Sequence, residues 1–270
     1  MNGPIGVFDS GLGGLTVAQA IAEALPQEDL VYLGDTARVP YGTKSAETVI
    51  AYARACARHL VQHEIKLLVV ACNTVSAVAL PLLAVELDLP IIGVIAAGAR
   101  AGVRASSNGR VGVIATPGTV VSGAYPRAFA GIDSRVEAVM GEAPLLVPLA
   151  EEGWTTGAVP ELAVTRYLTP LVERNIDALV LGCTHYPVLR DVVESQLTLL
   201  AGRPLPVVDS AHATAAELSA LIATRGLKSS STSQGSMRIL VTDRPARFLD
   251  VASRFLGHNL VATEITQVDL

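Results

Sequence analysis

The sequence has few cysteines and few aromatic residues, and each scarcity excludes a class of protein. Three cysteines among 270 residues are too few for a disulfide framework, and Cys56, Cys72 and Cys183 lack the paired C-x-x-C spacing of a structural zinc site. Aromatic residues make up 4% of the chain, and the formal net charge is −5. Nucleic-acid-binding proteins usually carry a basic stripe or stacking aromatic side chains, so we expect no nucleic-acid partner and no bound metal.

Long hydrophobic runs are also absent, although half of the residues are hydrophobic. No apolar run approaches the roughly 18 residues that indicate a membrane span. Residues 1–4 lead directly into an apolar segment, without the basic region and apolar core of a signal peptide. We therefore expect a cytoplasmic enzyme with no membrane partner.

Short apolar segments alternate with helical patterns along the chain. This alternation predicts an α/β fold in which mainly parallel sheets are layered with helices. The Ser-rich stretch 226–236 predicts a flexible surface loop. The expected strands are residues 5–9, 30–34, 66–71, 90–94, 111–114, 135–139, 177–182, 205–208, 238–241 and 260–264, with helical patterns that include 45–63, 74–86, 160–175, 187–198, 211–224 and 245–256.

Two of the apolar segments resemble each other closely, at residues 65–74 and 176–185. Each is a short hydrophobic run followed at once by a cysteine, Cys72 or Cys183, and then by a threonine within two residues. A buried parallel strand has this pattern, and ligands of open α/β sheets bind at the carboxyl ends of such strands. The repeat predicts two similar halves, each with one thiol at its ligand-binding edge.

A lone cysteine at the end of an apolar strand is more often a small buried residue than a reagent. Two cysteines in matched settings, each expected to open a helix, favour a chemical role, because a helix N-terminus favours the thiolate. His185 stands two residues after Cys183 and could assist its proton transfers, or it could be a packed histidine in a turn. Cys56 lies inside a helical pattern at core spacing, so we expect it to be a packing residue.

Other polar residues cluster where strands are expected to end. The first strand runs into a Gly-rich turn at Asp9, for which an ordinary capping role is the simpler interpretation. The segments 34–42 and 113–119 are further turn-rich loops that could hold a small zwitterion. Two acids, Glu151 and Glu152, precede Gly153, and surface charge is the simplest explanation for them.

Four motifs together closely resemble those of glutamate racemase, which belongs to the cofactor-independent aspartate/glutamate racemase family. They are Gly6–Gly14 (GVFDSGLGG), Gly34–Gly42 (GDTARVPYG), Ala71–Thr74 (ACNT) and Leu181–Pro187 (LGCTHYP), in the expected order. One departure is local: the segment Glu142-Ala143-Pro144 lacks a cysteine often seen before that proline. It lies away from the motifs that carry the resemblance.

The resemblance implies two pseudo-symmetric three-layer α/β domains with an active site in the cleft between them. It implies a first domain of residues 1–96 plus 209–270 and a second domain of residues 97–208. Cys72 and Cys183 would be the acid/base thiols, with Asp9 assisting the first and with Glu152 and His185 serving the second. Substrate would be held by Asp9, Ser10, Tyr41, Gly42, Asn73, Thr74, Thr119, Thr184 and His185.

The resemblance also implies interconversion of L-glutamate and D-glutamate without a cofactor, which supplies D-glutamate for bacterial peptidoglycan synthesis, and a homodimer. Two thiols suit this reaction because the α-hydrogen leaves one face of the carbon while a proton arrives on the other. Three alternatives stay open at this point. They are an isomerase for aspartate, hydantoins or a related acid, a two-domain binding protein with inert cysteines, and a covalent cysteine hydrolase.

Overall fold

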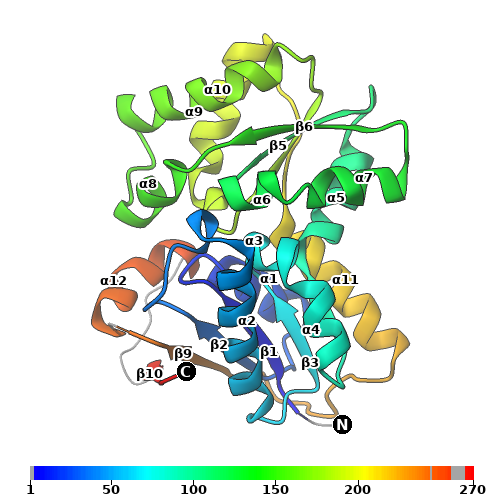
Figure 1. Ribbon diagram of the computed structural model, residues 1–270, viewed down its shortest axis with the longest axis vertical. Helices are drawn as coiled ribbons and strands as arrows, with labels where there is room; N and C mark the ends of the chain where they lie inside the picture. Colours follow the sequence, from blue (N-terminus) through cyan, green and yellow to red (C-terminus); the bar gives the residue numbers. More distant parts are fainter. Residues whose placement is uncertain (1–2, 244, 257–264) are drawn as a thin grey trace.

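A computed structural model describes residues 3–243, 245–256 and 265–270. Figure 1 shows two lobes stacked along the long axis of the molecule, each built around its own sheet with helices on both faces. The chain leaves the first lobe after β4, builds the second lobe, and returns to the first lobe for its last strands. This observed architecture is the predicted α/β fold.

The sheet of the first lobe has the strand order β10-β9-β2-β1-β3-β4, and every neighbouring pair is parallel. All residues of the three strands β1, β2 and β3 are buried, as near-continuous hydrophobic runs in a covered parallel sheet should be. The strands are β1 (Ile5–Asp9), β2 (Leu30–Gly34), β3 (Leu67–Val70), β4 (Ile91–Gly93), β9 (Met237–Val241) and β10 (Ile265–Gln267).

The sheet of the second lobe has the order β6-β5-β7-β8 and is also parallel throughout. Its strands are β5 (Arg110–Ala115), β6 (Glu137–Glu142), β7 (Ala178–Gly182) and β8 (Val207–Asp209). The order β6-β5-β7-β8 repeats the order β2-β1-β3-β4 of the first sheet, so β3 and β7 occupy equivalent positions. The predicted pseudo-symmetry of the two halves is therefore confirmed.

Helices cover both sheets, and two of them join the lobes. Helix α5 (Val94–Ala105) packs against α7 and β7 of the second lobe and also against α11 (Ser210–Thr224), which packs against α1 of the first. The first lobe also contains α1 (Leu15–Ala24), the 3-10 helix η1 (Tyr41–Thr43), α2 (Ala46–Val61), α3 (Asn73–Val78), α4 (Leu80–Glu86) and α12 (Pro245–Leu256). The second contains α6 (Pro117–Val121), α7 (Ala124–Ile132), α8 (Leu146–Glu152), α9 (Ala158–Val172), η2 (Tyr186–Leu189) and α10 (Arg190–Ala201). We retain the domain division at residues 96 and 208 as a proposal.

The differences from the predicted elements have local causes. Strand β6 begins at Glu137, later than the predicted 135–139, because the Val136 N–H donates to the Asp133 carbonyl and closes a turn there. The predicted strand 260–264 lies outside the described residues. The loop 226–236 is largely exposed, as predicted, but its start is anchored: buried Lys66 bonds to Glu28 and donates to the Leu227 carbonyl at 2.8 Å. Within the described residues, no helix is long and apolar enough to cross a bilayer.

Candidate active site

The two matched cysteines line one small cavity between the lobes. Cys72 follows β3 and Cys183 follows β7, the equivalent strand of the second sheet, so both thiols lie at carboxyl ends of strands. The cavity measures about 30 Å³, which is room for at least one water molecule. Its lining is Ser10, Val39, Pro40, Tyr41, Gly42, Cys72, Asn73, Thr74, Thr116, Val147, Cys183, Thr184 and His185.

The Cys72 thiol is buried and protonated. Its Sγ donates to Ser10 Oγ at 3.5 Å. Burial and, to a smaller extent, the nearby Asp9 carboxylate raise the pKa of the Cys72 thiol to about 12. The hydrogen bond to Ser10 lowers this pKa by less. Cys72 does stand at the start of α3, but the expectation that this helix start favours its thiolate is wrong, because the loss of solvation outweighs it.

Cys183 belongs to a short polar chain. Cys183 Sγ lies 3.9 Å from His185 Nδ1, and His185 Nε2 lies 3.0 Å from Glu151 Oε1. Burial opposes the charged imidazole, yet hydrogen bonding to Cys183 and Glu151 raises the pKa of His185 to about 10. Phe255 of α12 packs edge-on against the imidazole, with ring centroids 5.4 Å apart. A positive imidazolium therefore faces the Cys183 sulfur.

The structure does not bring Glu152 to this chain, and its predicted place beside His185 is taken by Glu151. Glu152 is exposed on α8, whereas the half-buried Glu151 reaches the imidazole. Successive residues of a helix point about 100° apart, so only one of two adjacent acids can face the cavity. The sequence contained both acids, but nothing local to them indicated which one would turn inward.

Asp9 bridges the lobes from the end of β1. Its carboxylate accepts a hydrogen bond from the Gly11 N–H at 3.0 Å and one from Thr184 Oγ1 at 3.4 Å. Burial raises the pKa of Asp9, while the charge of His185 and the backbone N–H groups of the turn partly oppose this shift. The simpler capping role is wrong, because Gly14 occupies the N-cap of α1 and no side chain caps that helix.

Uncommitted hydrogen-bonding capacity remains in the cavity wall. Asn73 is 3% exposed, and its Nδ2 has no hydrogen-bond partner among the described residues. The hydroxyl groups of Thr74, Thr116 and Thr119 lie 3.0 to 3.4 Å from one another across the lobe boundary. Thr119 is fully buried behind the cavity, and Thr116, which the sequence analysis did not select, lines it. The Asn73 amide and the threonine hydroxyls are hydrogen-bond donors suited to a carboxylate.

Tyr41 and Gly42 form one wall of the cavity on η1. The Tyr41 hydroxyl bonds to the buried Asp35 carboxylate, which also pairs with Arg38 at 2.7 Å and so holds this segment in place. A Cβ atom on Gly42 would lie 2.6 Å from Thr116 Cβ, so only glycine permits this close approach of the lobes. Cys56 is fully buried beside Tyr41, 4.0 Å from its hydroxyl, as its predicted packing role requires.

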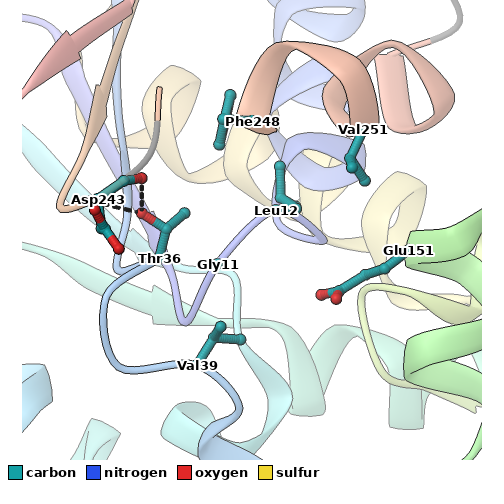
Figure 2. Close-up of a pocket in the computed structure, with 8 residues that line it drawn as sticks. All are labelled: Gly11, Leu12, Thr36, Val39, Glu151, Asp243, Phe248 and Val251. Atoms are coloured by element: carbon teal, nitrogen blue, oxygen red, sulfur yellow. Dashed lines mark hydrogen bonds between the residues drawn. The ribbon is translucent and has the colours of Figure 1, made fainter. Parts of the chain in front are cut away.

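A wider pocket of about 260 Å³ adjoins the cavity and shares Val39 with it. Figure 2 shows the Glu151 carboxylate extending from α8 toward this pocket, opposite Phe248 and Val251 of α12, with Thr36 hydrogen-bonded to Asp243 at the far side. Glu151 thus stands between open space and the buried His185. In the described part of the chain, no group of three or more His, Cys, Asp or Glu side chains is placed to hold a metal ion.

Comparisons with known proteins agree with one another. Residues 5–218 match the family described as Asp/Glu/Hydantoin racemase. The chain is 49% identical over 266 residues to glutamate racemase of Geobacter metallireducens, covering 98% of this chain and 96% of that protein.

Two solved structures are similar over nearly the whole chain. A glutamate racemase isoform from Bacillus anthracis is 37% identical, with a TM-score of 0.92 and coverage of 99% of this chain and 98% of that one. Glutamate racemase from Francisella tularensis, solved in complex with D-glutamate, is 36% identical, with a TM-score of 0.89 and the same coverage.

Proposed function

Because the chain belongs to the Asp/Glu/Hydantoin racemase family of isomerases, we propose that it interconverts L-glutamate and D-glutamate by a two-thiol mechanism without a cofactor. The proposed substrate follows from relatives named glutamate racemase, one of which was solved with D-glutamate. The observation that carries the mechanism is the position of Cys72 and Cys183 on one shared cavity.

The proposed reaction uses opposite protonation states of the two sulfurs. Cys72, with a pKa of about 12, holds its proton, and the imidazolium of His185 stabilises negative charge on Cys183. In one direction the Cys183 thiolate removes the α-proton, and the bonding pair of electrons stays on the substrate as a carbanion. The Cys72 thiol then donates its proton to the opposite face. In the other direction the roles are exchanged.

The carbanion needs stabilisation, because its charge spreads into the substrate α-carboxylate. Preorganised donors that meet such developing charge are an effective source of rate enhancement. Asn73 Nδ2 and the hydroxyls of Ser10 and Thr74 line the cavity and can donate there, while the Thr184 hydroxyl donates to Asp9. Burial of these side chains strengthens their hydrogen bonds to the developing charge.

The proposed biological role is supply of D-glutamate for peptidoglycan in the bacterial cytoplasm, by a homodimer with no nucleic-acid or membrane partner. This part of the proposal rests on the resemblance to glutamate racemases. Growth of a strain depleted of its own racemase, with and without this gene and external D-glutamate, tests the role. Failure of the gene to replace D-glutamate would contradict it.

Circular dichroism of pure L-glutamate with purified protein and no added cofactor tests the activity. The signal should decay to zero, and in heavy water the product should carry deuterium at Cα because an exchangeable thiol delivers the proton. An unchanged signal would overturn the proposal, and a faster reaction with aspartate in the same assay would change the substrate. Retention of the original hydrogen would indicate a single shielded base.

A further inference from the structure

One polar contact at the cavity crosses between the lobes. The hydroxyl of Tyr125, on α7 of the second lobe, donates to Asn73 Oδ1 of the first lobe at 2.9 Å. Tyr125 is fully buried, and Asn73 is one of the residues that line the cavity. The carbonyl end of this amide is therefore occupied, while its Nδ2 end has no partner among the described residues.

We propose that Tyr125 is a positioning residue, whose hydroxyl fixes the amide of Asn73 so that Nδ2 is presented to the substrate carboxylate. The inference rests on the proposed function for the identity of that substrate. Tyr125 is not among the residues selected from the sequence, and it reaches the substrate only through Asn73.

The alternative orientation of the amide is unfavourable. If the Asn73 amide turned over, its nitrogen would face the Tyr125 oxygen, and the carbonyl oxygen would face the cavity. The tyrosine hydrogen would then be buried without an acceptor, whereas in the observed orientation it is donated to Asn73 Oδ1. The carbonyl oxygen on the cavity side would also repel a carboxylate. The hydrogen bond from Tyr125 therefore selects the orientation that binds an anion.

The surroundings keep the Tyr125 hydroxyl a donor. Burial raises the pKa of Tyr125 well above its ordinary value, and the nearby Cys183 acts in the same direction, so the phenol stays protonated at working pH. Gly98 of α5 leaves room for it, since a Cβ atom there would lie 3.3 Å from the hydroxyl oxygen. Because the two partners belong to different lobes, Asn73 is correctly oriented only when the lobes are together.

A double-mutant cycle tests this role. Tyr125→Phe, Asn73→Ala and the double variant are compared with wild type by kcat, KM and the dissociation constant for D-glutamate from calorimetry. Loss of one neutral hydrogen bond of about 0.5–1.5 kcal/mol corresponds to about a 2- to 12-fold decrease in kcat/KM for Tyr125→Phe. In the Asn73→Ala background, Tyr125→Phe should lower kcat/KM by less than twofold, because the amide that Tyr125 orients is already gone.

A matched control is Tyr167→Phe, which removes a hydroxyl from the same lobe. That hydroxyl accepts a hydrogen bond from the Leu145 N–H at 3.3 Å, away from Asn73. Tyr167→Phe should leave kcat/KM unchanged, and urea midpoints show whether each variant is folded. The inference would be overturned if Tyr125→Phe lowered kcat/KM equally in both backgrounds, or lowered it in neither. If Asn73→Ala is too slow to assay, the same comparison is made with the dissociation constants for D-glutamate. A wild type that neither racemises nor binds glutamate would instead overturn the proposed function.

Discussion

At the scale of single residues, burial and near neighbours decide which groups carry charge. Cys72 sits beside the Asp9 carboxylate and keeps its proton, whereas His185 gains one between Cys183 and Glu151. The two thiols follow equivalent strands, yet their polar partners differ, a serine hydroxyl for one and an imidazole for the other. Matched backbone positions therefore hold two chemically distinct groups.

Replacing either Cys72 or Cys183 with alanine should reduce racemisation by about 100-fold or more, because each removes the acid or base on one face of the substrate. Both side chains are small and buried, so the folded structure should persist. Initial rates and far-ultraviolet circular dichroism check this expectation. Turnover near the wild-type level in either variant would contradict the two-thiol mechanism.

The adjacent acids of α8 provide a matched pair of variants. Glu151→Gln should lower kcat/KM by about 10- to 100-fold, since hydrogen bonds to charged groups contribute roughly 1.5–3 kcal/mol. Glu152→Gln makes the same chemical change at an exposed position and should have little effect. Steady-state kinetics distinguish the two. A larger loss from Glu152→Gln would restore the sequence-based assignment.

His185 should also make stability depend on pH. Its pKa rises from an ordinary 6.5 to about 10, so the folded state holds a proton that the unfolded state releases between these values. The contribution is complete below pH 6.5 and is lost as pH rises toward 10, at no more than about 1.4 kcal/mol per pH unit. Urea unfolding of wild type and His185→Asn should therefore converge with rising pH. A constant difference between the two would contradict the assigned charge.

At the scale of elements, the turn between β1 and α1 must pass very close to the Cys183 motif. A Cβ atom on Gly13 would lie 2.3 Å from Thr184 Oγ1 and 2.5 Å from His185 Nδ1. No side chain fits there without displacing both groups. Gly13 therefore allows the β1 edge of one lobe to lie against the Cys183 motif of the other.

Gly13→Ala should lower kcat/KM by about tenfold or more, because it displaces His185 by part of an ångström and small misplacements are costly in catalysis. Gly131→Ala is a suitable control, since a Cβ atom on that glycine of α7 meets nothing within 4 Å. It should be fully active and slightly more stable, as alanine favours a helix over glycine. Kinetics and melting temperatures measure both. Full activity of Gly13→Ala would show that the turn can shift freely.

At the scale of the whole molecule, the two lobes close over a small cavity. The cavity measures about 30 Å³ and adjoins the wider pocket of about 260 Å³ that shares Val39 with it. The lobes meet through polar contacts, such as Thr74 with Thr116 and Asn73 with Tyr125, and through apolar packing, such as that of Ala77 in a cluster with Val113. We expect the lobes to part when substrate enters, and helices α5 and α11, which pack against each other and join the lobes, to accommodate that motion.

Iodoacetamide labelling can measure this opening. Cys72 and Cys183 are 5% and 7% exposed, so the reagent reaches them only when the lobes separate, while the fully buried Cys56 should stay unmodified. Saturating D-glutamate should slow labelling of the two cavity thiols about tenfold or more by holding the lobes together. Mass spectrometry of the labelled peptides locates each adduct. An active enzyme whose cavity thiols never react would show that substrate enters without separation.

The sequence by itself determined the alternation of strands and helices, the thiols at two equivalent strand ends and the family. The spacing of hydrophobic residues predicts the strands and helices, and short motifs of up to about ten residues indicate the thiols and the family. Only the tertiary structure decided that Glu151 rather than Glu152 meets His185, that burial raises the pKa of Cys72, and that Tyr125 donates to Asn73. Each of these depends on helix rotation, burial and contacts between segments tens of residues apart, which exist only once two sheets pack face to face and exclude water from the space between them.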